Sequence, residues 1–278
     1  MRVGRIHVMT APMCGSIEAL VPVLQAAGSL LFCLDFDGTL APTAESPDLV
    51  TMTEELQDTM RALAAVPAVT IAVISGRSVA DLRQRFDRKV ICAGCHGLEI
   101  EAAGLRFVRA DALQLAAVVD QAAWDLEAAV LNVPGVFVER KSLCATLHYR
   151  QVQPDLVGWL QSTLEWVLGP YRGLLRISRA HEAWEILPCV EWNKGSALRY
   201  LVERSRPSCP FVVCAGDDLT DEDLFAAVEN GVSISVGELK PTRAAYRIGD
   251  PHEFADFLRA VCFALCGRQA AVPGIETG

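Results

Sequence analysis

Two stretches of the chain, near 30–108 and 189–265, alternate short apolar runs with segments whose apolar residues recur at helical spacing. The runs have the length of buried strands, and the periodic segments are typical of amphipathic helices. The predicted strands are 30–34, 69–74, 90–92, 211–214 and 232–236, and the predicted helices are 54–66, 79–86, 194–203, 221–229 and 253–265. Because strands that are apolar throughout are buried on both faces, this alternation predicts an α/β fold, a doubly wound, Rossmann-like parallel sheet.

Three of the predicted helices begin with a hydroxyl residue that is followed three positions later by an acid. In such a capping box the hydroxyl oxygen accepts a hydrogen bond from a free backbone N–H group of the first turn. The pairs are Thr51 with Glu54, Ser78 with Asp81, and Thr220 with Asp223.

The middle of the chain has a different pattern. A long Ala-rich helix is predicted over 112–131 and a second helix near 155–168, and the strand-like segments are 136–139, 144–149, 174–178 and 183–187. This mixture interrupts the βα alternation, so we expect an inserted α+β cap domain over 109–188. The core domain would then comprise 29–108 and 189–278, with 1–28 as a loosely attached N-terminal extension.

Composition narrows the range of partners. The chain has 278 residues, 51% of them apolar, and a formal net charge of −9. A negative chain is a poor match for nucleic acid, which binds a basic face. An anionic substrate would have to be held by local positive charge or by a metal ion.

Cysteine usage and hydropathy favour a cytoplasmic protein. Ten cysteines are present without any CxxC pair, and several lie inside apolar runs, where a reduced thiol behaves as a small apolar group. The uncharged stretch 19–34 is interrupted by Pro22, Gln25 and Gly28 and is shorter than a membrane span requires. We recognise no signal peptide, and oligomeric state has no visible signature.

Polar residues follow three of the predicted core strands. Asp35 and Asp37 end the first, residues 75–77 (Ser-Gly-Arg) follow the second, and residues 216–218 (Gly-Asp-Asp) follow the strand at 211–214. Ligands of an open parallel sheet bind beyond the carboxyl ends of its strands. These three loops should therefore converge on one site.

Carboxylates gathered in this way would repel one another unless a hard cation lay between them. Mg²⁺ prefers oxygen ligands and binds substrate phosphate while keeping several waters. The predicted cofactor is therefore Mg²⁺.

The same segments resemble a known family. "DFDGTL", "ISGRS", a lysine that opens a helix (Lys194) and "GDDLTDED" are similar to the four motifs of haloacid dehalogenase superfamily phosphatases. Within that superfamily, "GCHGLEIE", "ERKSLCATLHYR", "EILP", "WNKGSAL" and "AGDDLTDEDLF" most resemble the trehalose-6-phosphate phosphatase family. The resemblance covers about 30–236 in the same order, and it implies a haloacid dehalogenase type core with a cap.

The resemblance implies a phospho-aspartate mechanism. Asp35 would attack phosphorus, and Asp37 would protonate the departing sugar oxygen and then activate water. Lys194 would pair with the phosphate or with the nucleophile. Asp221 would act through a water molecule or by orienting Lys194, although acids also cap helix starts.

The implied metal and phosphate sites use the same loops. The metal would be held by Asp35, the backbone carbonyl of Asp37, Asp217 and, through water, Asp218, for which helix capping is again an alternative. Ser75 would donate a hydrogen bond to the phosphate, with Gly38 and Gly76 alongside. For Arg77, phosphate contact, surface charge and interdomain pairing all remain open.

The implied sugar contacts lie mainly in the cap. Alternation along the strands places polar side chains on one face, and those that match sugar-pocket positions are Glu139, Lys141, His148, Arg150 and Glu185. A solvated sheet face is the alternative for each. His96 and Glu99 would contact substrate or the hinge, whereas Trp184 and Trp192 are expected to pack.

The sequence thus predicts a phosphatase that converts trehalose 6-phosphate to trehalose and phosphate, the last step of trehalose biosynthesis. The alternatives are hydrolysis of another phosphosugar, such as sucrose 6-phosphate or a mannosyl phosphate, a receiver-like module phosphorylated on Asp35, and an inactive regulatory homologue. The inserted domain argues against a receiver, and the complete set of motif residues argues against an inactive chain.

Overall fold

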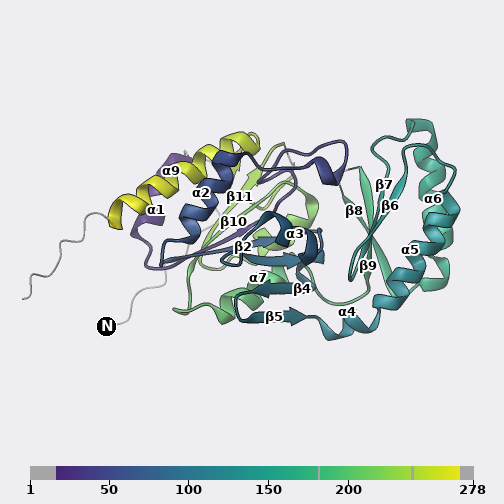
Figure 1. The fold of residues 1–278 in the computed structure, drawn as a ribbon, viewed down its shortest axis with the longest axis horizontal. Coiled ribbons are helices and arrows are strands. Elements are labelled where there is room, and N and C mark those ends of the chain that lie inside the picture. Colours follow the sequence, from purple (N-terminus) through teal and green to yellow (C-terminus); the bar gives the residue numbers. More distant parts are fainter. Residues whose placement is uncertain (1–16, 181, 239–240, 270–278) are drawn as a thin grey trace, which may run out of the picture.

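A computed structural model describes residues 17–180, 182–238 and 241–269. They form a core built on an eight-stranded sheet and a smaller cap at one end of it (Figure 1). The strand order of the core sheet is β12-β11-β10-β1-β2-β3-β4-β5. Its strands are β1 (Leu30–Leu34), β2 (Val69–Ile74), β3 (Ile91–Gly94), β4 (Glu99–Ala102), β5 (Leu105–Val108), β10 (Phe211–Gly216), β11 (Gly231–Val236) and β12 (Tyr246–Ile248).

The parallel sheet expected from the sequence is confirmed from β12 to β3. β1 lies in the middle and pairs with β10 and β2, so that Leu34 is level with Ala215 and Val73. The loops that follow these three strands therefore emerge at one edge of the sheet. The antiparallel hairpin of β4 and β5, which the sequence analysis missed, extends the sheet beyond β3.

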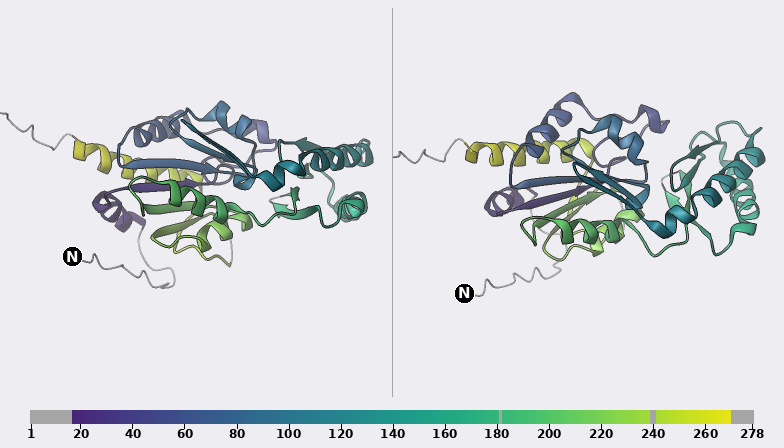
Figure 2. Two further views of the ribbon diagram at one scale, coloured as in Figure 1. Left: turned by 90° about the horizontal axis from the view of Figure 1, so that it is seen from below. Right: turned by 60° about the horizontal axis from the view of Figure 1, so that its bottom comes forward.

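Helices cover both faces of the core sheet, as a doubly wound fold requires (Figures 1 and 2). One face carries α1 (Leu20–Ala26), α2 (Glu54–Ala64), α3 (Val79–Arg85) and α9 (Pro251–Gln269), and the other carries α7 (Lys194–Arg204) and α8 (Glu222–Ala226). Short 3₁₀ turns are η1 (Ile17–Ala19), η2 (Pro47–Leu49), η3 (Cys95–Gly97), η4 (Pro154–Leu156), η5 (Gly169–Tyr171) and η6 (Leu219–Asp221).

The extension predicted over 1–28 is not loosely attached in its described part. Leu20 and Leu24, one helical turn apart on α1, are buried in the core, and Gln25 donates a hydrogen bond to the carbonyl oxygen of Ala264 on α9 (3.0 Å). Residues 1–16 lie outside the described residues. This part packs on the core because two buried leucines remove from water apolar area that a free segment would expose.

Helix capping follows the predicted chemistry but not always the predicted residue. Ser78 caps α3 as expected, accepting from Asp81 N (3.2 Å). The cap of α2 is Thr53 rather than Thr51. At the third site Thr220 lies inside η6, and the reciprocal capping box is formed by Asp218 and Asp221.

The cap is a four-stranded antiparallel sheet with two helices on its outer face (Figure 1). Its order is β6-β7-β9-β8, from β6 (Phe137–Arg140), β7 (Ala145–His148), β8 (Leu175–Ala180) and β9 (Ala183–Pro188), with α5 (Ala116–Val130) and α6 (Val157–Val167) packed against it. α4 (Ala110–Gln114) leads in from the core.

The single helix predicted over 112–131 is broken at Leu115 into α4 and α5. Ala112 on α4 packs into the apolar cluster that joins core and cap, whereas Val119 on α5 packs into the interior of the cap. Because α4 and α5 pack into different apolar clusters, the chain changes direction between them.

Two tryptophans have the packing role expected of them. Trp184 is 3% exposed and lies against Tyr149, and Trp192 donates its indole N–H to Gly97 O (2.9 Å) beside Phe107. Within the described ranges, we find no helix with the combined length and apolarity that a bilayer crossing demands.

Candidate active site

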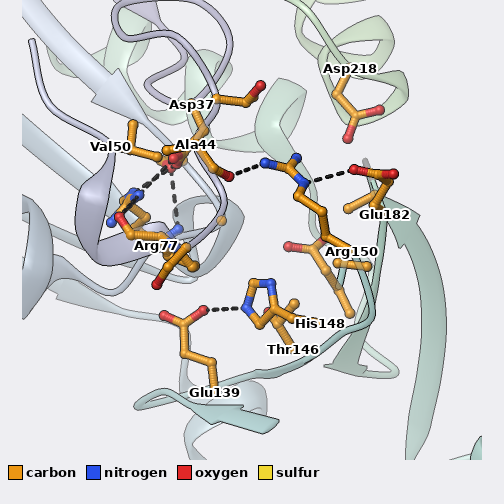
Figure 3. A pocket seen from close by; sticks show the side chains of 18 of the residues that line it. Asp37, Ala44, Val50, Arg77, Glu139, Thr146, His148, Arg150, Glu182 and Asp218 are labelled. Carbon is orange, nitrogen blue, oxygen red and sulfur yellow. Dashed lines mark hydrogen bonds and ion pairs between the residues drawn. The ribbon is translucent and has the colours of Figure 1, made fainter. Parts of the chain in front are cut away.

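A cavity of about 320 Å³ lies between the strand ends of the core and the inner face of the cap sheet. Figure 3 shows the side chains that project into it from both domains. Its size lies at the lower end of the range for small-molecule pockets, roughly 300–1,000 Å³. The loops after β1, β2 and β10 all contribute to the wall, as predicted from the parallel topology.

Lys194 lies between two carboxylates at the floor of this cavity. Its ammonium donates to Asp35 Oδ1 and to Asp221 Oδ1, each at 2.8 Å. Lys194 is the first residue of α7, so a helix start that Asn193 caps fixes its position. All three side chains are buried. Of the alternatives left open by the sequence, the structure shows Lys194 paired with Asp35 and in direct contact with Asp221.

Several charged side chains lie close together in this buried site, and the pKa values of Asp35, Asp217 and Lys194 are shifted as a result. Burial, together with repulsion from Asp221 and Asp217, raises the pKa of Asp35 well above its ordinary value despite Lys194. Burial and repulsion from Asp221 raise the pKa of Asp217 to about 7. Burial alone would lower the pKa of Lys194, but Asp221 and Asp35 raise it above its ordinary value. The lysine thus stays charged, whereas Asp35 and Asp217 need further positive charge to ionise together.

The donor set fits a hard cation. One carboxylate oxygen each from Asp35, Asp217 and Asp221 lies within 4.8 Å of the others. Asp221 is already engaged, because its Oδ2 accepts the backbone N–H groups of Asp217 and Asp218 (3.2 and 3.1 Å) and its Oδ1 accepts from Lys194. Asp35 and Asp217 are therefore the carboxylates best placed to bind a metal ion. The side chain of Asp218 instead accepts from Leu219 N, as a helix cap.

Gly38 makes the approach of Asp217 possible. Its φ of +79° is one that side-chain-bearing residues rarely adopt, and a Cβ built here would lie 2.1 Å from Asp217 Oδ2. A glycine in the first loop is thus a steric requirement for the acidic cluster formed with the third.

Asp37 is paired with Arg77. The guanidinium donates Nε–H to Asp37 Oδ2 (2.7 Å) and Nη2–H to Asp37 Oδ1 (2.6 Å), and it also contacts Asp81 (2.8 Å) and Pro47 O (2.7 Å). Arg77 is 5% exposed and its partners all belong to the core, so surface charge and interdomain pairing are both excluded for this state. Asp37 lies outside the cluster of Asp35, Asp217 and Asp221.

Ser75 and Gly76 form the second loop of the site. Ser75 is 1% exposed and its hydroxyl oxygen accepts from Arg77 N (3.2 Å). A Cβ at Gly76 would lie 2.7 Å from Glu185 Oε1. The glycine therefore lets a cap carboxylate approach the loop that is expected to hold phosphate.

The cap strands present a paired set of polar groups to the cavity. Glu139 Oε2 contacts His148 Nε2 (2.9 Å) and Lys141 Nζ (3.4 Å). Lys141 donates to Gly76 O and to Thr146 Oγ1, both at 2.9 Å. Burial would raise the pKa of Glu139, but His148 and Lys141 lower it, so the carboxylate stays ionised at neutral pH.

His96 and Glu185 connect the core to the cap. Glu185 Oε1 and His96 Nε2 are 2.8 Å apart, and both residues are buried. Burial would raise the pKa of Glu185, but His96 and then Lys141 lower it to about 2. Its other oxygen, Oε2, is also 2.8 Å from His96 Nε2, so both carboxylate oxygens face the imidazole. An ionised carboxylate paired with a core histidine therefore lines the cavity.

Two residues predicted near the sugar have interdomain contacts. Arg150 donates to Glu182 Oε2 (2.7 Å) and to the carbonyl oxygen of Ala44, in the core loop 43–47 (Figure 3). The described residues that line the cavity do not include Glu99. Its Oε1 accepts hydrogen bonds from Ser142 Oγ (2.7 Å) and Val79 N (2.9 Å). Of the two roles left open for Glu99, the hinge contact is the one observed.

The sequence analysis missed several wall residues. Phe137 stacks on His148, with 4.4 Å between ring centroids, and it could have been found because it lies two positions before Glu139 on the same strand face. Glu182 and the loop 43–47 had no periodic signal, since both lie in turns.

Comparison with known proteins gives a consistent result. A family model described as trehalose-phosphatase matches residues 33–252. A trehalose-phosphate phosphatase of Mycobacterium marinum is 35% identical over 236 residues, which cover 80% of this chain and 59% of that protein. Trehalose 6-phosphate phosphatase RA3 of Zea mays is 30% identical, over 89% of this chain and 74% of that protein. The chain thus spans about three fifths of the mycobacterial relative.

Among solved structures, the C-terminal domain of the C. albicans trehalose-6-phosphate phosphatase superimposes with a TM-score of 0.79 at 23% identity. The match covers 91% of this chain and 99% of that domain. At this identity the likeness supports the fold, a haloacid dehalogenase type core with a cap.

Proposed function

The chain belongs to the trehalose-phosphatase family, and from that premise we propose that it hydrolyses trehalose 6-phosphate to trehalose and inorganic phosphate. The observation that carries this proposal is the pairing of Asp35 with Lys194 at the floor of a cavity whose opposite wall is the polar face of the cap. The floor suits a phosphoryl group and the cap wall suits a sugar.

Asp35 is the proposed nucleophile. Its carboxylate attacks phosphorus, the bond from phosphorus to the sugar oxygen breaks, and the sugar leaves with a proton from Asp37. Water then attacks the phospho-aspartate, gives its proton to Asp37, and inorganic phosphate departs from Asp35. Lys194 holds the nucleophile through its 2.8 Å contact, and its fixed charge faces the oxygens of the transferring group.

Asp37 must change partner during this cycle. In the state described here both of its oxygens accept hydrogen bonds from Arg77. As an acid it must carry a proton and reach the sugar oxygen. The proposed mechanism therefore includes a rotation of Asp37 away from Arg77, whose remaining contacts with Asp81 and Pro47 O keep it in place.

Mg²⁺ is the proposed cofactor, held by Asp35, Asp217 and the backbone carbonyl of Asp37, with Asp218 in reach through water. When bound it compensates the carboxylates and draws charge from the phosphoryl oxygens. The raised pKa of Asp217 supports this assignment, because buried neighbouring carboxylates resist ionisation without an added cation.

The cap wall supports a sugar as the rest of the substrate. Glu139, Lys141, His148 and Glu185 offer ionised acceptors and donors around one cavity. Charged groups make the stronger hydrogen bonds to hydroxyls. Glu185 is held by His96, 2.8 Å away, and its buried carboxylate lines the same cavity. Arg150 contributes by joining the cap to the loop 43–47.

The substrate is tested by measuring phosphate release from trehalose 6-phosphate, sucrose 6-phosphate, glucose 6-phosphate and mannose phosphates. We expect kcat/KM for trehalose 6-phosphate to exceed the others by roughly a hundredfold, since unpaired charged groups penalise a sugar that does not match. Equal values across the panel would remove the proposed specificity. A higher value for sucrose 6-phosphate would reassign the substrate.

A further inference from the structure

A second cavity, of about 190 Å³, adjoins the catalytic cavity at Lys194. The two cavities share His96, Lys194 and Thr220 as lining residues. The second one is bounded by β8 of the cap and by the η6 turn of the core. Nothing in the proposed reaction uses it.

Two arginines of β8, Arg176 and Arg179, line this second cavity. Neither guanidinium has a hydrogen bond or ion pair with any residue in the described ranges. By contrast, Arg140 of the cap forms an ion pair with Asp120. Unpaired guanidinium groups at a cavity are notable in a chain whose net charge is −9.

The strand register shows which β8 residues of this cavity wall face the core. On β8, Arg176 is level with Leu187 and Ser178 is level with Glu185 on β9. Glu185 contacts His96 of the core, so the β8 residues on that face are also turned inward. Arg176 is half-buried in this position. Arg179 is level with Trp184 on the opposite face of β8, and it is an exposed residue that lines the cavity at the edge strand of the sheet.

The remaining lining groups suit an anion. Ser178 and Thr220 add hydroxyl donors and Asn193 adds an amide. Asp223 contributes one carboxylate, which is exposed and forms no ion pair with either arginine in the described structure. Two guanidinium groups against one carboxylate leave a local excess of positive charge.

We propose that this second cavity is an anion site of the phosphate class, formed by Arg176 and Arg179 beside Lys194. Guanidinium groups bind phosphate oxygens through paired N–H donors. Its occupant is inorganic phosphate, either leaving after turnover or entering from solution. The first of these sources rests on the proposed phosphatase function, whereas the binding site itself does not.

Inorganic phosphate in EDTA is the direct probe. In EDTA the catalytic floor lacks the divalent cation that is proposed to help hold a phosphoryl group there, whereas the arginine site needs no metal. We expect isothermal titration of the wild-type chain in EDTA to show one phosphate per chain. The double variant Arg176→Ala/Arg179→Ala should weaken that binding by about tenfold or more, because two charged donors are lost.

The matched control is Arg172→Ala, which removes an exposed arginine just before β8 that lines neither cavity. It should bind phosphate as the wild type does. Since Arg176 and Arg179 have no partners to lose, both variants should keep the wild-type melting temperature. Absence of phosphate binding by the wild type in EDTA, or equal binding by the double variant, would overturn the site.

Kinetics then identify the source of the phosphate. Slower phosphate release by the double variant in a single turnover assigns the site to the leaving product. Unchanged release with a weaker response to added phosphate assigns it to phosphate from solution. A chain that binds phosphate in EDTA but hydrolyses no phosphosugar would retain this site while removing the proposed function.

Discussion

Replacement of Lys194 by methionine tests how the buried charges of the site are balanced. Methionine keeps the length of the side chain and removes the ammonium that lies 2.8 Å from both Asp35 and Asp221. Removing one partner of a buried ion pair costs roughly 3–5 kcal/mol, because a buried charge remains uncompensated. In a chain of this size that corresponds to a melting temperature lower by roughly 6–20 °C.

A second substitution separates charge balance from catalysis. In Lys194→Met/Asp221→Asn, the asparagine oxygen can still accept from Asp217 N and Asp218 N, and its NH₂ group can face Asp35. One of the two uncompensated charges is gone. We expect the double variant to recover at least half of the lost stability and none of the lost activity, since Asp35 still lacks its ammonium.

Urea unfolding followed by tryptophan fluorescence measures the stability, in EDTA and again in Mg²⁺, and phosphate release measures the activity. The loss in Lys194→Met should be smaller in Mg²⁺, because the added cation compensates part of the charge. Lys89→Met, at an exposed lysine, is the control and should match the wild type. Unchanged stability of Lys194→Met in EDTA would refute the charge argument, and recovered activity in the double variant would refute the catalytic role.

Three further outcomes follow from the same contacts. Asp37→Asn should slow release of the sugar by roughly 10²–10⁴-fold. With an aryl phosphate, whose leaving group needs little protonation, the variant should accumulate phospho-enzyme on Asp35, which mass spectrometry detects. Turnover of both substrates at wild-type rates would leave Asp37 without a proton-transfer role. Glu139→Gln should raise KM for the phosphosugar by about tenfold through one weakened charged hydrogen bond, with an aryl phosphate hydrolysed as before; equal losses on both would place Glu139 in the fold. The pKa of Glu185, lowered from 4.5 to about 2, means that its ionised form stabilises the folded chain above pH 4.5 and that this contribution is lost as pH falls toward 2. Its size is at most about 3 kcal/mol, so Glu185→Gln should show a shallower loss of unfolding free energy between pH 4.5 and 3 than the wild type, and identical slopes would contradict the assignment.

The arrangement of the core was predictable because it depends on local patterns with a topological consequence. Apolar runs ending in Asp35 and Gly216 were recognisable as neighbouring parallel strands, and parallel strands place their carboxyl ends together. The pairing of Lys194 with Asp35 came instead from the family resemblance, because Lys194 opens a helix and does not end a core strand. The hairpin at 99–108 was missed, because Glu99–Ala102 alternates polar and apolar residues over a length too short to distinguish from a loop.

Choices among equivalent partners were not predictable. Thr51 and Thr53 are both plausible caps for the same helix, and only the backbone angles of the folded chain select Thr53. Asp218 was expected at the metal through water, but its side chain caps a helix start. Arg77 could have bound phosphate, and its choice of Asp37 depends on where two loops meet in space. Such outcomes depend on tertiary geometry and leave no period in the sequence.

The central position of β1 affects the order in which the chain can assemble. Its neighbour β10 follows the whole cap in the sequence, so during synthesis the cap residues emerge before the strand that completes the nucleophile's surroundings. Until then β1 has an unpaired, fully apolar edge, the kind of surface that recruits other chains. A chain that ends between 188 and 211 would therefore have a complete cap beside an open sheet, and such a fragment should depend on chaperones to stay unaggregated.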